Sequence, residues 1–115
     1  MAAVPQATHE TLSGITTGDL AFLETAVGLR EAQLEATGLD ARTFALVKIA
    51  VLIALDAPPA SYAWQVANAL EDGATAADIL GVLRAVAPQV GGPRVVAAAP
   101  ELMLALGLDL PDGLQ

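Results

Sequence analysis

The chain has 115 residues, of which 55% are apolar and 16% are charged, and its formal net charge at pH 7 is −8. This length fits one domain with a real core. The negative charge disfavours binding to nucleic acids or anionic membranes, which depends on Lys and Arg. The absence of cysteine excludes disulfide bonds and thiolate metal sites.

Residues 1–18 are weakly patterned and rich in Thr, Gly and Ala, which predicts a flexible N-terminal arm. They lack the basic region and apolar stretch of a signal peptide, so we expect a cytoplasmic protein. The only histidine, His9, is interpreted as a solvated residue of the arm. The alternative is that the arm folds over a pocket and His9 acts there. One histidine argues against a histidine-based metal centre, and no cofactor is expected.

Residues 19–37 predict an amphipathic helix that ends at Gly38. Its apolar stripe consists of Leu20, Leu23, Val27 and Leu34. The acidic residues lie largely on its other faces, as in a bundle helix with a solvated side.

The most apolar stretch is residues 44–55, in which Lys48 is the only polar residue. Asp40 is the predicted N-cap of this helix, and Arg42 is expected to form an exposed pair with it. A membrane-spanning helix needs about 18 or more apolar residues, so this stretch is too short. Because it is apolar on all sides, we predict a central bundle helix that is enclosed on every side.

A second helix is predicted from Pro59, which suits a first helical position, to Gly73, a typical residue just past a helix end. Tyr62 lies on one face of this helix with Gln65 at the edge of the same face. Trp64 lies on another stripe and is interpreted as a packing or interface anchor.

The segment 75–78 has the pattern of a capping box, and a fourth helix is predicted from it to about Ala87. Residues 91–93, Gly-Gly-Pro, form the next break; a phosphate-binding loop would need a preceding strand and further glycines. The last helical region follows this break. Pro100 predicts a kink there, or a short helix followed by a separate one over 101–106.

The predicted fold is therefore all-α, a small bundle of about five to six helices. The predicted organisation is an arm at 1–18, a single all-helical domain at 19–107 and a C-terminal tail at 108–115. The excess of apolar residues in so small a domain indicates that part of them is buried against other subunits.

Seven short pieces occur in a fixed order along the chain. They are Leu39-Asp40, Thr43, Ile49-Ala50-Val51, Ala69-Leu70, Gly73-Ala74-Thr75, Asp78-Ile79 and Gly91-Gly92-Pro93. Their order and spacing resemble the carboxymuconolactone decarboxylase-like family, which includes the alkylhydroperoxidase D group, over residues 17–107. The resemblance implies an all-helical homo-oligomer, usually a trimer or hexamer.

The chain departs from this family at the residues that carry its chemistry. Decarboxylase members have a histidine where this chain has Gln65, and often a glutamate where it has Ser61. Hydroperoxidase members have Cys-x-x-Cys where residues 57–60 read Ala-Pro-Pro-Ala. A glutamine cannot shuttle a proton near neutral pH as histidine can, and without cysteine there is no thiol for peroxide chemistry.

Three residues are the candidate catalytic or ligand-binding groups: Lys48, Tyr62 and Gln65. Lys48 either extends its charge to solvent or pairs with a carboxylate, or it has a lowered pKa and acts as a base or anion holder. Tyr62 and Gln65 lie where the resembling family has its site, although ordinary hydrogen bonding inside a bundle is the alternative. If a small-molecule site exists, we expect it between the Lys48 helix and the Tyr62–Gln65 helix, near a subunit boundary.

Two functional hypotheses follow. In the first, the protein is a cofactor-independent lyase or isomerase acting on a small cyclic or aromatic-derived acid. Lys48 or His9 would then carry the proton, and Gln65 and Tyr62 would orient a carbonyl. In the second, the fold has lost catalysis and serves as an oligomeric binding or scaffold protein. A titratable group in a polar pocket would favour the first, and an apolar or filled pocket the second.

Overall fold

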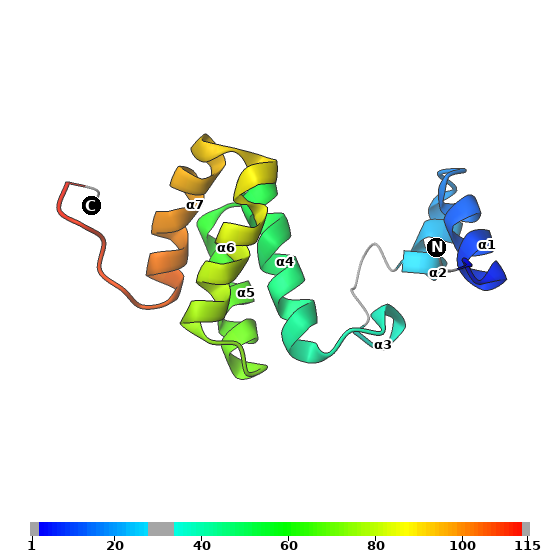
Figure 1. The fold of residues 1–115 in the computed structure, drawn as a ribbon, viewed down its shortest axis with the longest axis horizontal. Coiled ribbons are helices and arrows are strands. Elements are labelled where there is room, and N and C mark those ends of the chain that lie inside the picture. The colour runs from blue at the N-terminus through cyan, green and yellow to red at the C-terminus, as the bar shows by residue number, and fades with distance from the viewer. Residues whose placement is uncertain (1–2, 28–33, 114–115) are drawn as a thin grey trace. The chain divides into compact units, whose positions relative to one another are not determined.

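The computed structural model describes residues 3–27 and 34–113. These residues form helices and turns without a β-strand, which confirms the all-α fold class (Figure 1). The helical segments in these ranges are α1 (Gln6–Ile15), α2 (Leu20–Val27), α3 (Leu34–Thr37), α4 (Ala41–Leu55), α5 (Pro59–Glu71), α6 (Ala76–Val90) and α7 (Gly92–Ala105). The chain divides into two compact units, Met1–Gly38 and Leu39–Gln115.

In the first unit, α2 packs against α1 at Gly14, which has no side chain. A carbon atom added to Gly14 would overlap the ring of Phe22, so glycine permits this close approach. The helix α2 is capped by Asp19, whose Oδ1 accepts a hydrogen bond from the Phe22 N–H at 2.8 Å. The helix α1 lies in the segment predicted as an arm; none of its residues is buried, and His9 is exposed. The flexibility of the arm stays a prediction.

The helix predicted over residues 19–37 is described only at its two ends. The helix α2 covers its beginning and the single turn α3 its end, whereas residues 28–33 lie outside the described residues. The side chains of Leu20, Leu23 and Val27 also lie outside them, so the packing of the predicted stripe stays a prediction.

The second unit begins with the caps that the sequence predicted. Asp40 accepts a hydrogen bond from the Thr43 N–H at 2.7 Å and starts α4. The helix α5 begins at Pro59. The capping box of α6 is complete, because Thr75 and Asp78 each accept a hydrogen bond from the backbone N–H of the other, at 3.1 and 2.8 Å.

Four helices, α4 to α7, build the core of this unit. The helix α4 packs against α5, α6 and α7, and α7 also packs against α5 and α6 (Figure 1). The buried core residues are Ala45, Ile49, Ile53, Tyr62, Val66, Ala69, Ala74, Ile79, Ala98 and Leu102. They recur at helical spacing on α4, α5 and α7, so one stripe of each helix faces the shared interior.

Two prolines lie inside helices, which corrects the predicted ends. The helix α6 continues past Pro88 to Val90, and α7 continues through Pro100, so a separate helix over 101–106 is wrong. An interior proline costs about 3 kcal/mol in an isolated helix. In α7 the residues on either side of Pro100, Ala98 and Leu102, are buried, and this packing offsets the cost.

The prediction that α4 is enclosed on every side is wrong for the single chain. Val47 and Val51 are 49% exposed and Leu55 is 70% exposed. These residues are four apart and share one face of α4, because only the opposite face packs against other helices. We call Val47, Val51 and Leu55 the α4 stripe. No helix in the described ranges is long and apolar enough to cross a membrane.

Arg42 forms its ion pair with Asp78 rather than with Asp40, which corrects the sequence expectation. Its guanidinium lies 2.7 Å from the Asp78 carboxylate and thereby joins the first turns of α4 and α6. The hydrogen bond from Arg42, together with that from the Thr75 N–H, lowers the pKa of Asp78 below its ordinary value.

The Arg42–Asp78 ion pair should make part of the stability of the fold depend on pH in the acidic range. The pKa of Asp78 is lower in the folded chain than in the unfolded chain. The stabilisation by the Asp78 carboxylate is therefore fully present at pH values above its pKa in the unfolded chain, and it is lost as the pH falls through its pKa in the folded chain. We expect Asp78→Asn to lower the melting temperature at pH 7. The difference from the parent should vanish at a pH well below about 3.9, the ordinary aspartate pKa. If the melting temperature of Asp78→Asn lies below that of the parent by the same amount at pH 7 and at acid pH, the ion pair makes no ionic contribution to stability.

Candidate functional site

Tyr62 of α5 links the two helices of the α4–α5 hairpin through a hydrogen bond to α4. The Tyr62 hydroxyl donates a hydrogen bond to the carbonyl oxygen of Leu52 at 3.2 Å, and the Ala57 N–H donates to the same oxygen at 3.1 Å. Lys48 lies one turn before Leu52 on α4, and Gln65 lies one turn after Tyr62 on α5. The two helices are joined by a short turn and run in opposite directions, so Lys48 and Gln65 lie at similar depth along the hairpin.

Tyr62 is a core residue with 1% of its surface exposed. Burial raises the pKa of its hydroxyl, and the carboxylates of Asp56 and Glu101 raise it further against the opposing charge of Arg94. The phenol therefore stays protonated at neutral pH and donates its proton to the backbone. Only its oxygen lone pairs remain for another partner.

Gln65 has a buried acceptor without a partner. Its Oε1 atom is shielded from solvent and accepts no hydrogen bond, whereas the residue as a whole is partly exposed. An unpaired buried acceptor costs about 1–3 kcal/mol, so this atom needs an explanation. A molecule with an N–H or O–H group at this point would remove the cost.

Lys48 is half-buried and contacts its own helix. Its Nζ atom lies 4.1 Å from the centroid of the Phe44 ring, one turn earlier on α4. This cation–π contact contributes about 0.5–1 kcal/mol at exposed sites. The four-residue spacing of Phe44 and Lys48 was visible in the sequence and would have predicted the contact.

The segment that corresponds to the cysteine pair by resemblance carries no thiol. Ala57 is partly buried in the turn between the two helices, and Ala60 is exposed in the first turn of α5. Within the described part of the chain, no group of three His, Asp or Glu side chains is placed to hold a metal ion. At this hairpin Gln65 supplies a hydrogen-bonding amide and Lys48 a positive charge.

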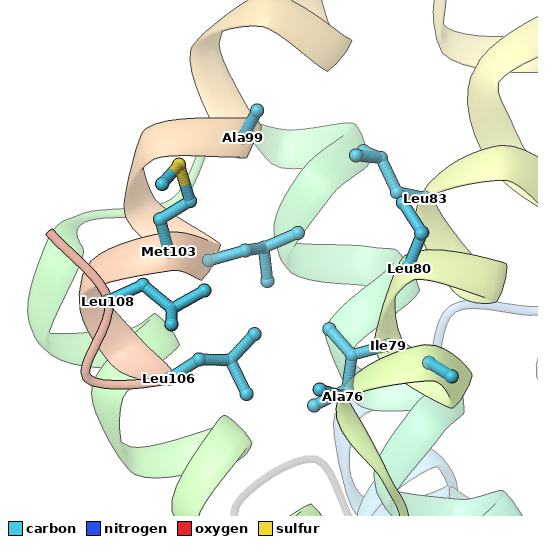
Figure 2. A pocket seen from close by; sticks show the side chains of 10 residues that line it. Ala76, Ile79, Leu80, Leu83, Ala99, Met103, Leu106 and Leu108 are labelled. Atoms are coloured by element: carbon cyan, nitrogen blue, oxygen red, sulfur yellow. The ribbon is translucent and has the colours of Figure 1, made fainter. Parts of the chain in front are cut away.

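A cavity lies elsewhere, between α6 and α7. Its volume is about 350 Å³. Figure 2 shows α6 side chains on one side and α7 side chains on the other, with Leu108 of the following segment on the α7 side beside Met103 and Leu106. The lining residues are Ala76, Ala77, Ile79, Leu80, Leu83, Ala99, Leu102, Met103, Leu106 and Leu108. Lys48, Tyr62 and Gln65 do not line it, and sequence analysis did not predict it because apolar helix residues give no signal of a gap in packing.

The sequence is similar to a known protein family over most of its length. The sequence profile of the carboxymuconolactone decarboxylase family matches residues 21–102, well over half of the chain. No individual curated protein and no solved structure gives a match to the chain.

Proposed function

The chain belongs to the carboxymuconolactone decarboxylase family, and we propose that it is a homo-oligomeric member that binds a small ring-containing molecule at the α4–α5 hairpin. In this proposal the family's thiol and histidine chemistry is lost. The observation that carries it is the buried, unpartnered Oε1 atom of Gln65, at the position where the family resemblance expects a histidine.

The unpaired acceptor defines the ligand more closely than the family does. An amide oxygen accepts hydrogen bonds, so its partner must carry an N–H or O–H group. Tyr62 offers only lone pairs as well, since its proton is donated to the Leu52 carbonyl. A hydroxyl or amine on a ring therefore fits this position better than the carbonyl that sequence reasoning assigned to Gln65 and Tyr62.

Lys48 has a supporting role in this proposal. Lys48 lies at similar depth to Gln65 in the hairpin, and its ammonium group, which now contacts the Phe44 ring, would turn to pair with a carboxylate on the ligand. The proposed ligand class is thus a small hydroxylated cyclic or aromatic acid. The catalytic form of the same hypothesis is a lyase or isomerase that uses Lys48 as proton carrier, and turnover of a bound hydroxy acid would reveal it.

Gln65→Leu tests the proposal with 3-hydroxybenzoate as the probe. We expect the parent to bind it and the variant to bind it about tenfold or more weakly, because the ligand hydroxyl would be buried without a partner at a cost of about 1–3 kcal/mol. Without ligand, Gln65→Leu should melt at the same or a higher temperature, since it removes an unpaired buried acceptor. Titration calorimetry and thermal unfolding measure the two effects.

Benzoate and Asn68→Leu provide matched controls. Benzoate lacks the hydroxyl, so its affinity should be the same for the parent and Gln65→Leu. Asn68 is another partly buried amide on α5, and its replacement by leucine should leave the binding of 3-hydroxybenzoate unchanged. If Gln65→Leu dissociates or destabilises the oligomer instead, the Gln65 amide serves a subunit contact and the ligand site is wrong.

A further inference from the structure

We propose that the α6–α7 cavity is a second binding site, for a compact uncharged hydrocarbon ligand such as a fused bicyclic ring. This site is separate from the hairpin, because neither Lys48 nor Gln65 lines it. The inference therefore does not rest on the function proposed for the hairpin.

The cavity has a buried floor and apolar walls. Ile79 of α6 and Leu102 of α7 are only 1% and 5% exposed, and they close it toward the core. Leu80 and Leu108 are 44% and 51% exposed and lie toward solvent. The labelled side chains surround a common space in Figure 2, so this is a concave site rather than a flat apolar face.

The wall of the cavity at Leu108 is held by a defined helix terminus. The Leu108 N–H donates to the Met103 carbonyl at 2.9 Å, and the Gly107 N–H donates to the Leu104 carbonyl at 3.0 Å. With Gly107 at φ 78°, these bonds form a Schellman motif. The motif brings the side chains of Met103 and Leu108 together at the cavity, so this wall is formed before any ligand arrives.

The lining sets the chemistry of the ligand. All ten lining residues are Ala, Ile, Leu or Met, so no side chain offers a charge or a conventional hydrogen-bond group. A carboxylate buried here would lose its hydration without gaining a partner. Apolar cavities of about 150 Å³ bind benzene, so a cavity of about 350 Å³ accommodates roughly ten to twelve carbon atoms.

The concave, wholly apolar lining favours a small molecule as the occupant. The apolar side chains that we propose for a subunit contact lie on a different element, in the α4 stripe. We therefore assign the α6–α7 cavity to a ligand.

Naphthalene binding to the full chain tests this site. We expect one naphthalene per chain by titration calorimetry, and no displacement of it by an equal concentration of 1-naphthoate, which has the same rings and a carboxylate. Ala99→Leu places a larger side chain in the cavity and should weaken naphthalene binding at least tenfold. Ala97→Leu, at an exposed position on the same helix outside the lining, should leave it unchanged.

Further readouts separate the alternatives. Leu83→Ala enlarges the cavity and should raise the affinity for the tricyclic phenanthrene, which tests the site even if Ala99→Leu does not fold. Gln65→Leu should leave naphthalene binding unchanged. The inference is overturned if naphthalene does not bind, if an equal concentration of 1-naphthoate displaces it, or if Ala99→Leu binds like the parent. It is also overturned if Ala99→Leu changes the mass of the assembly, because a second copy would then cover the cavity.

Discussion

The double variant Val51→Glu, Leu55→Glu is expected to convert the proposed homo-oligomer into monomers. Each of these side chains, if buried between subunits, stabilises the contact by about 1.5–3 kcal/mol. Its replacement by glutamate would bury an unpaired charge instead. Because Val51 and Leu55 are 49% and 70% exposed in the single chain, the substitutions should leave the core of each subunit intact. Light scattering coupled to gel filtration gives the mass, and circular dichroism gives the helix content.

Val96→Glu is the matched control for this prediction. Val96 is 73% exposed on α7, an apolar residue outside the α4 stripe. If Val96→Glu dissociates the assembly and the α4 variant does not, the subunit contact lies on α7. A parent protein that is already monomeric at micromolar concentration would refute assembly altogether. Trp64, 70% exposed on α5, gives a second readout, because its fluorescence shifts to the red if dissociation exposes it further.

The helix starts were predictable because their signals are local. Asp40, Pro59 and the Thr75–Asp78 capping box act within three residues of the helix ends, and the structure places all of them as predicted. Such signals depend on backbone N–H groups that neighbouring side chains can reach without any tertiary structure. The all-α class follows from the same periodic and local information.

The features that the sequence did not predict depend on residues far apart in the chain. The pairing of Arg42 with Asp78 requires α4 and α6 to place their first turns together. The continuation of α7 through Pro100 requires tertiary packing to offset a local penalty. Trp64 shows the same limit. The sequence did not decide whether this side chain packs in the core or at an interface, and its exposure in the structure excludes a place in the core of this chain.

The candidate site was predictable in position but only partly in chemistry. Helical spacing placed Tyr62 and Gln65 near one another on α5, and resemblance drew attention to them. The donation from Tyr62 to the Leu52 carbonyl could not be predicted, because it depends on the depth at which α5 packs against α4. The same packing leaves the Gln65 Oε1 atom buried without a donor, so the proposed partner changes from a carbonyl to a hydroxyl or amine.

The second large effect expected is the absence of the family's two reactions. With Ala57 and Ala60 where the family resemblance places the cysteine pair, peroxide consumption with a dithiol donor should equal that of a heat-treated control. With Gln65 where the resemblance places the histidine, decarboxylation of carboxymuconolactone should be slower by about 10²–10⁴-fold than in members with that residue, because this is the contribution of a positioned acid or base. Peroxide loss above the control would contradict the thiol argument.

Gln65→His separates loss of the proton carrier from loss of the substrate pocket. An imidazole at this position titrates near pH 6.5 in the absence of perturbation, whereas the amide does not titrate. If the pocket persists, this variant should gain decarboxylation of carboxymuconolactone with a rate that changes between about pH 5 and 8. If the variant folds, assembles and still shows no turnover, the pocket itself differs from that of the decarboxylases. Decarboxylation by the unaltered protein at the family's rate would show instead that another group carries the proton, with Lys48 as the first residue to replace.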